Sequence, residues 1–264
     1  MAILKHFSSR LMHPLPFLLL ALTLNGQNSQ KEYYEIKTYR LKDKSQEERV
    51  HAFLTYDFLP TAHKFGIKKV GVFIPLETDS TFGKRIVVLI PYTSLEQLSK
   101  LNDLLLAKEE YDPKAKEYVN AEYTNPPYDR IESVLLQAFS GMPHMEAPQF
   151  DNVRADRVYE LRSYEGPTEK IHKNKVQMFN EGDEVGLFKR LHFNAVFYAE
   201  VISGRRMPNL MYMTTFDNMA SHDAHWKAFV EDPYWIKLKS MPEYQHNVSK
   251  INIYLLRPTE YSDY

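Results

Sequence analysis

The sequence predicts an α+β protein made of two tandem ferredoxin-like units, each with the order β-α-β-β-α-β. The strand YEIKTY at residues 34–39 recurs as YELRSY at residues 159–164, and every change between the two copies is conservative. The same succession of alternating and helical patterns follows each copy, and residues 141–156 between them form a linker without periodicity. Because such a unit leaves one sheet face uncovered, we expect the two units to close their open faces against each other.

The first unit spans residues 32–140 and begins with an alternating strand at residues 33–41. Residues 45–65 carry apolar side chains at helical spacing, with Ser45 as the expected N-cap. Pro60 is expected to kink this helix. The remaining elements are strands at 68–77, 85–93 and 132–140 and a helix at 95–120 that Ser94 caps.

The second unit spans residues 157–258 and repeats this order. Its elements are strands at 158–164, 191–203, 209–216 and 248–256, helices at 168–183 and 218–229, and a short helical segment at 232–241. Thr168 is the expected cap of its first helix.

The first 26 residues have the layout of a secretory signal peptide. Lys5 and Arg10 precede the apolar run LPFLLLALTL at residues 15–24, and small and polar residues follow it. The alternative is an uncleaved membrane anchor. The chain has no cysteine, and export without disulfides favours a bacterial periplasm or the extracellular space. We therefore expect an exported protein without other membrane contact.

A formal net charge of −1 gives no basic field that would attract nucleic acid. With 44% hydrophobic and 13% aromatic residues the chain can build a substantial core. We expect a small-molecule ligand as the partner. The oligomeric state is left open between a monomer with an internal pseudo-dimer and a homo-oligomer.

Several short motifs in order resemble the NIPSNAP family. They are the two unit starts already quoted, FGIKKVGVF at residues 65–73 and DPYW at residues 232–235. The resemblance covers two tandem copies and nearly the whole chain behind the signal peptide. It implies a dimeric α/β barrel, the superfamily to which that family belongs, closed here within one chain. Other members of the superfamily are cofactor-free monooxygenases and haem-handling enzymes, so the resemblance permits cofactor-free oxygenase- or isomerase-like chemistry.

The polar side chains of the repeated strand are the first candidate site, and we expect them to face the barrel interior. They are Glu35, Lys37 and Tyr39 in the first copy and Glu160, Arg162 and Tyr164 in the second. If this site is catalytic, we expect Glu160 to act as a general base and Arg162 to stabilise a developing oxyanion. The alternative is that these groups pair with one another and hold the sheets together.

The second unit is also rich in aromatic and amide side chains that could bind a ligand. These are Asn194, Tyr198, Tyr212 and Trp226. The alternative is an ordinary aromatic core. His222 and His225 lie three residues apart on a predicted helix, which makes them a weak metal candidate against the alternative of two solvent-facing histidines. No metal site and no cofactor is otherwise expected.

Two functions remain open on the sequence. The protein is an exported binder of a small organic ligand held between its two units, or it is a non-catalytic interaction module whose barrel is filled by side chains. A cavity of a few hundred Å³ between the units would favour the first reading.

Overall fold

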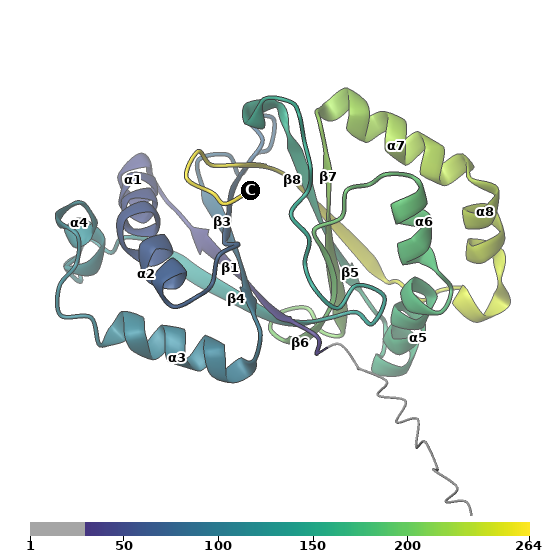
Figure 1. Ribbon diagram of the computed structural model, residues 1–264, viewed down its shortest axis with the longest axis horizontal. Helices are drawn as coiled ribbons and strands as arrows, with labels where there is room; N and C mark the ends of the chain where they lie inside the picture. Colours follow the sequence, from purple (N-terminus) through teal and green to yellow (C-terminus); the bar gives the residue numbers. More distant parts are fainter. Residues whose placement is uncertain (1–29) are drawn as a thin grey trace, which may run out of the picture.

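The computed structural model describes residues 30–264, and the predicted signal peptide at residues 1–26 lies outside this part. Eight antiparallel strands of the described chain form one closed barrel, in the order β1-β3-β2-β8-β5-β7-β6-β4. Figure 1 shows the barrel in the middle of the molecule, with one layer of helices on each flank. Within the described residues, the helices are all too short or too polar to cross a bilayer.

The first half of the chain supplies four strands and the helices of one flank. The strands are β1 (Tyr33–Arg40), β2 (Gly71–Pro75), β3 (Arg85–Tyr92) and β4 (Arg130–Ala138). The helical elements are α1 (Lys44–Phe53), the π-helical turn η1 (Leu54–Phe58), α2 (Leu59–Lys64), α3 (Leu95–Leu106), η2 (Pro113–Ala115) and α4 (Lys116–Val119).

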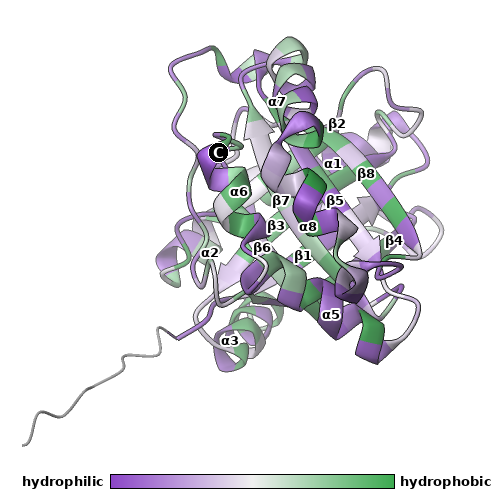
Figure 2. Ribbon diagram, turned by 90° about the vertical axis from the view of Figure 1, so that its right-hand side faces the viewer, coloured by the Kyte–Doolittle hydropathy of each residue, from purple (hydrophilic) through white to green (hydrophobic). Residues whose placement is uncertain are grey.

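The second half repeats this arrangement on the opposite flank. A short 3-10 turn, η3 (Arg154–Asp156), precedes it. The strands are β5 (Val158–Glu165), β6 (Phe197–Ser203), β7 (Asn209–Phe216) and β8 (Lys250–Pro258). The helical elements are α5 (Glu169–Asn180), α6 (Glu184–Arg190), α7 (Met219–Glu231), α8 (Pro233–Ser240) and η4 (Pro242–Tyr244). Figure 2 shows these helices lying across the outer face of their sheet.

Two seams join the halves into one barrel. At the first, β2 pairs with β8, so that Phe73 lies opposite Pro258. At the second, β4 pairs with β6, so that Ala138 lies opposite Ala199. The strands that would be the edges of each half-sheet therefore satisfy their backbone groups on the other half.

The barrel interior is a packed apolar core to which both halves contribute. Tyr34 and Ile36 of β1 meet Tyr159 and Leu161 of β5 in one continuous cluster with side chains of the other strands. All four side chains are at most 3% exposed. A barrel of this size can be filled by interdigitating side chains, and the apolar members of each strand fill its interior here.

The predicted orientation of the repeated strand is therefore wrong. The alternate residues, Glu35, Lys37, Tyr39, Glu160, Arg162 and Tyr164, point outward beneath the helices instead of into the barrel. Tyr39 belongs to the core between the first half-sheet and its helices, and Tyr164 belongs to the equivalent core of the second half. The outer face suits charged groups because they pair there while their tips stay near water: the side chains of Lys37 and Arg162 are 16% and 13% exposed.

One end of the barrel is closed by aromatic rings. Tyr264 returns from the segment after β8, and its ring centre lies 5.9 Å from that of Phe73 and 6.3 Å from that of Tyr159. Its hydroxyl donates to the sulfur of Met145 in the linker at 3.0 Å. The linker and the final segment thus seal the same end of the lumen.

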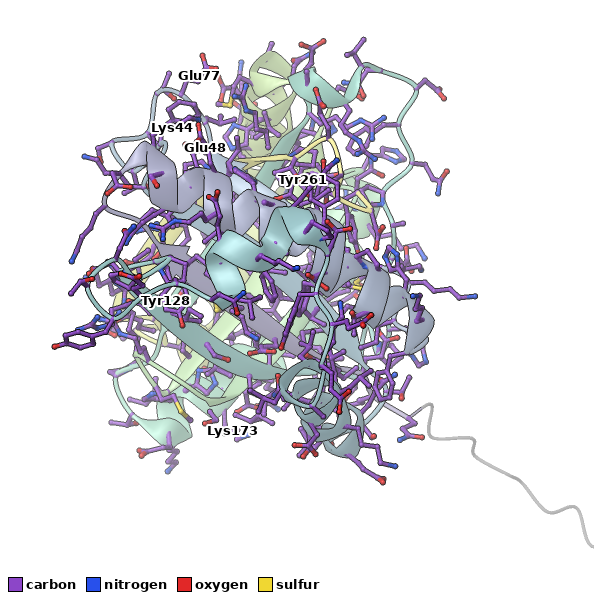
Figure 3. All side chains as sticks on the ribbon, turned by 90° about the vertical axis from the view of Figure 1, so that its left-hand side faces the viewer. Lys44, Glu48, Glu77, Tyr128, Lys173 and Tyr261 are labelled. Carbon is purple, nitrogen blue, oxygen red and sulfur yellow. The ribbon has the colours of Figure 1, made fainter. Side chains whose placement is uncertain are left out.

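The segment after β8 also runs along the first half. The Thr259 amide donates to the carbonyl of Val72 at 2.9 Å, and the Val70 amide donates to the carboxylate of Asp263 at 2.7 Å. The Tyr261 hydroxyl lies 2.6 Å from Nδ1 of His51 on α1. Figure 3 shows Tyr261 beside the helices of the first half.

Most predicted elements agree with the structure, and Ser94 and Thr168 cap their helices as expected. The first helix is capped by Asp43 instead of Ser45, because the Asp43 carboxylate accepts the Gln46 amide at 2.9 Å. The predicted helix at 95–120 ends at Leu106. The predicted strand at 191–203 begins only at Phe197, and the unpredicted helix α6 precedes it.

The packed lumen predicts a large cost for removing one of its rings. Phe73 is 0% exposed, so Phe73→Ala should lower the free energy of unfolding by about 3–5 kcal/mol, measured by urea titration. Phe82, which is 39% exposed, provides the control: Phe82→Ala should cost less than about 1 kcal/mol. Equal losses for both variants would contradict a lumen that acts as a structural core.

Candidate functional site

A buried polar network lies between the second half-sheet and its helices. Its centre is Glu160 on β5, whose side chain is 1% exposed. Because side chains alternate along a strand, Arg162 and Tyr164 emerge on the same outward face. Helix α7 lies over this face and adds Trp226 and His222 to the network.

Three groups hold the Glu160 carboxylate. Arg162 Nε donates to Oε1 at 2.9 Å, and Trp226 Nε1 donates to Oε2 at 2.6 Å. Nε2 of His222 lies 3.5 Å from the same Oε2. Burial opposes ionisation of Glu160, but the contacts with His222 and Arg162 outweigh it and lower the pKa of the carboxyl group. Glu160 is therefore an ionised, fully engaged carboxylate, which makes it a weak candidate for the predicted general base.

Arg162 connects this carboxylate to a pair of phenols. Its guanidinium carbon lies 3.6 Å from the ring centre of Trp226, a cation–π contact. Its Nη1 donates to the Tyr164 hydroxyl at 3.3 Å, which lies 2.9 Å from the Tyr212 hydroxyl. Five predicted site residues, Glu160, Arg162, Tyr164, Tyr212 and Trp226, thus form one connected chain, although under the helices instead of in the barrel.

A buried ion pair that was not predicted from the sequence lies next to the phenols. Lys175 Nζ donates to Glu184 Oε2 at 2.8 Å, with residue exposures of 4% and 2%. Burial raises the pKa of Glu184, although the charge of Lys175 opposes it. A signal was present: Lys175 shares the apolar stripe of its helix with Met178 and Phe179, an unusual place for a lysine.

An open cleft of about 400 Å³ lies at the edge of this helix layer. One wall is the linker, residues 141–149, and the other is formed by α6 and the start of β6. The predicted ligand-binding residues Asn194 and Tyr198 both line it, together with His192. His192 and Asn194 have left-handed backbones with φ of 58° and 43°, a strained conformation that is over-represented at functional sites.

Tyr198 is the buried polar group of this cleft. It is 1% exposed, and its hydroxyl has no hydrogen-bond partner among the described residues. Burial, followed by the charges of Glu184 and Glu146, raises the pKa of Tyr198 well above its ordinary value. The hydroxyl therefore stays protonated and is available as a donor. Its ring stacks on that of Tyr212 at 5.6 Å, which places the cleft next to the polar network.

The predicted residues of the first half lie in the other helix layer, across the barrel from this network. Glu35 accepts hydrogen bonds from Tyr92 at 3.0 Å and from Ser133 at 2.6 Å, and Lys37 lies 3.6 Å from it. Tyr39 packs against Tyr118 and Tyr128. The two copies of the repeated strand therefore do not combine into one site.

The two histidines of α7 have different hydrogen-bond partners. His222 Nδ1 lies 2.8 Å from Oδ1 of Asp223, while His225 Nδ1 lies 2.7 Å from the carbonyl oxygen of Ser221. The residues that the structure describes contain no group of three side chains able to hold a metal ion.

Comparison with known proteins supports the fold. The NIPSNAP family model matches residues 159–263, which is most of the second half. A proposed monooxygenase from Lactobacillus acidophilus NCFM is 11% identical, with a TM-score of 0.55 over 86% of this chain and 94% of that protein. A proposed monooxygenase from Fusobacterium nucleatum is 7% identical, with a TM-score of 0.57 over 87% and 93%.

A third solved structure, an anthrone oxidase-like protein, is 9% identical, with a TM-score of 0.53 over 88% of this chain and 93% of that protein. The chain therefore has the tandem dimeric α/β-barrel fold. A search of curated proteins found no match.

The contact between His222 and Glu160 predicts a pH-dependent stability. Partial burial opposes protonation of His222, but hydrogen bonds and charge from Glu160 and Asp223 outweigh it and raise the pKa above the ordinary 6.5. A raised pKa adds stability that is present below about pH 6.5 and lost as the pH rises through the folded-state value. The Tm difference between the wild type and His222→Gln should thus be largest near about pH 5–6 and shrink above about pH 7.

The control for this experiment is His246→Asn, at an exposed histidine that takes part in no contact of the network. Asparagine tolerates the left-handed backbone at this position, where φ is 56°. A Tm difference for His222→Gln that does not change with pH would exclude the coupling to Glu160.

Proposed function

We propose that the protein binds a small, largely aromatic organic molecule in the cleft of its second half, through an oxygen atom that accepts a hydrogen bond from Tyr198. The observation that carries this proposal is the protonated, buried hydroxyl of Tyr198, which has no partner among the described residues and belongs to a residue that lines a 400 Å³ cleft. A buried donor left unpaired costs about 1–3 kcal/mol, which a ligand oxygen would recover.

The dimensions and walls of the cleft favour a molecule of this kind. Its volume lies within the range of about 300–1,000 Å³ that is usual for small-molecule sites. Behind Tyr198, the rings of Tyr212 and Phe188 lie 5.6 and 5.8 Å away and form a rigid aromatic layer. A planar ring of the ligand would pack against Tyr198, the aromatic residue in the cleft lining, and Glu146 and Lys189 of the same lining would contact its polar groups.

The chemistry that we propose is oxygenation of an electron-rich aromatic compound by molecular oxygen, without a resident cofactor. One oxygen atom becomes the carbonyl oxygen at a CH2 carbon of the substrate, and the other leaves as water with the two hydrogens of that carbon. The support is the fold shared with two proposed monooxygenases and an anthrone oxidase-like protein. Tyr198 would bind the substrate oxygen and stabilise the charge that develops on it. Arg162 and Glu160 would act as positioning residues that fix the phenol layer, since their own groups are engaged with each other.

The packed barrel favours a different role for the space between the halves. Large side chains fill the lumen, as the alternative of a packed barrel predicted. We therefore place the aromatic ligand within the second half instead of between the two halves. Oxygen uptake in the presence of a bound aromatic compound separates an oxygenase from a protein that only binds.

We also infer that the first half is a diverged NIPSNAP-like copy and that the protein is exported. The inference on the first half rests on the repeated strand and on the matching element order of the two halves. The inference on export rests on the basic, apolar and small-residue succession of the first 26 residues, and on the absence of cysteine.

Tyr198→Phe tests the proposed ligand contact. With anthrone as the probe and tryptophan fluorescence as the readout, the loss of one buried hydrogen bond should weaken binding about tenfold. Oxygen uptake with anthrone should fall in parallel.

Tyr159→Phe is the matched control, because the Tyr159 hydroxyl is also buried without a partner among the described residues but lies in the barrel lumen. It should leave anthrone binding unchanged. Equal binding by the wild type and both variants would refute the role of Tyr198 and of the cleft.

Export predicts a shortened mature protein. Expression of the full chain in a bacterium should yield a periplasmic product about 26 residues shorter, identified by intact-mass measurement. Replacing Lys5 and Arg10 by glutamate should keep the full-length chain in the cytoplasm. A full-length product held in the membrane fraction would instead indicate an uncleaved anchor.

A further inference from the structure

The open end of the barrel carries an unusual concentration of arginines. The recess at this end is lined by Arg40 of β1, Arg85 of β3, and Arg205 and Arg206 of the turn between β6 and β7. Both halves of the chain contribute to it. We propose that this mouth is a binding site for a small organic anion with two or more negative charges, distinct from the cleft of the second half.

The strand arginines are held together against their mutual repulsion. In the sheet register Arg40 lies directly opposite Arg85 on one side and directly opposite Arg130 on the other. Side chains directly opposite one another in antiparallel strands share a face, and like charges in such pairs are destabilising. Of these three, Arg40 and Arg85 line the recess, so two like charges meet at this rim and an anion would relieve their repulsion.

The two turn arginines line the same recess as Arg40 and Arg85. Arg205 and Arg40 both contact Oε1 of Glu132. Arg206 donates to the Tyr254 hydroxyl at 3.0 Å, and its Nε lies 3.7 Å from a Glu165 carboxylate oxygen. The ring of Tyr254 also lies 5.4 Å from the guanidinium carbon of Arg85.

The carboxylates at the mouth do not balance these charges. Glu132 is the single acidic residue among those that line the recess, against four arginines. Partial burial opposes ionisation of Glu132, but the hydrogen bond and charge of Arg40, with the charges of Arg205 and Arg85, lower its pKa. Even with Glu165 counted, the mouth keeps an excess of two positive charges.

The recess below the arginines sets the size of the ligand. Its volume is about 90 Å³, below the range of about 300–1,000 Å³ that is usual for drug-sized ligands, so it admits only a small group. Its walls are mainly apolar, with Ile36, Val87, Leu161 and Met211 among the lining residues. Thr38 and Asn209 add polar groups below the rim.

This combination selects a short, multiply charged acid. Guanidinium groups match carboxylate and phosphate oxygens with paired hydrogen bonds. A phosphate group or a short dicarboxylate fits the volume, and a few carbon atoms can contact the apolar wall. Since both halves supply arginines, the bound anion would link them across the mouth.

Titration calorimetry of the whole protein with inorganic phosphate and with succinate, at constant ionic strength, tests the proposal. The wild type should bind at least one of them saturably, and the anion that binds more tightly shows whether the site prefers a phosphate or a dicarboxylate. Arg205→Gln combined with Arg206→Gln should weaken that binding about tenfold or more, because two charge-assisted contacts are lost. Both arginines are exposed and lie in a turn, so the fold should be retained, as the Tm of each variant would show.

Two further variants separate a built site from general attraction. Arg205→Lys combined with Arg206→Lys keeps the charge but removes the planar fork, and should still lose most of the affinity. Lys227→Gln removes one exposed charge on α7 and should bind like the wild type. The absence of saturable binding by the wild type to either anion, or equal affinities in all variants, would overturn the proposal.

Discussion

The two seams between the half-sheets are the constraint on which the rest of the structure depends. A four-stranded half-sheet with one helical layer has two open edges and one bare face. The pairing of β2 with β8 and of β4 with β6 removes both edges at once and rolls the bare faces into a common lumen. Most residues of the eight strands thereby belong either to the packed interior or to a layer beneath helices, whereas Ile131, Ile251 and Ile253 on the outer face stay exposed.

This assignment explains which parts of the site could be predicted from the sequence. The residue types were informative: Glu160, Arg162, Tyr164, Tyr212 and Trp226 do meet in one network. Their side of the sheet was predicted wrongly, because periodicity divides a strand into two faces without saying which face meets the partner sheet. Leucine and tyrosine fill the lumen, whereas the charged groups need pairing partners and a route to water, which the helix side supplies.

The sequence predicted the architecture but not every element. The repeated strand and the repeated element order predicted two units that close on each other, because both copies keep the same pattern of buried positions. Helix α6 was missed since its sequence follows a glycine and an aspartate with a left-handed backbone, which read as a loop. The arginine mouth was missed because its members come from two strand ends and a turn, and only the barrel register brings them together.

The path of the chain at the β2–β8 seam has a consequence for biogenesis. Residues 73–75 find their sheet partners in residues 256–258, so the first half cannot complete its edge until nearly all of the described chain has been synthesised. Contacts so distant in sequence form slowly. A nascent polypeptide of this kind completes its sheet late, which would favour the export proposed above by keeping the chain competent for threading through a translocation pore.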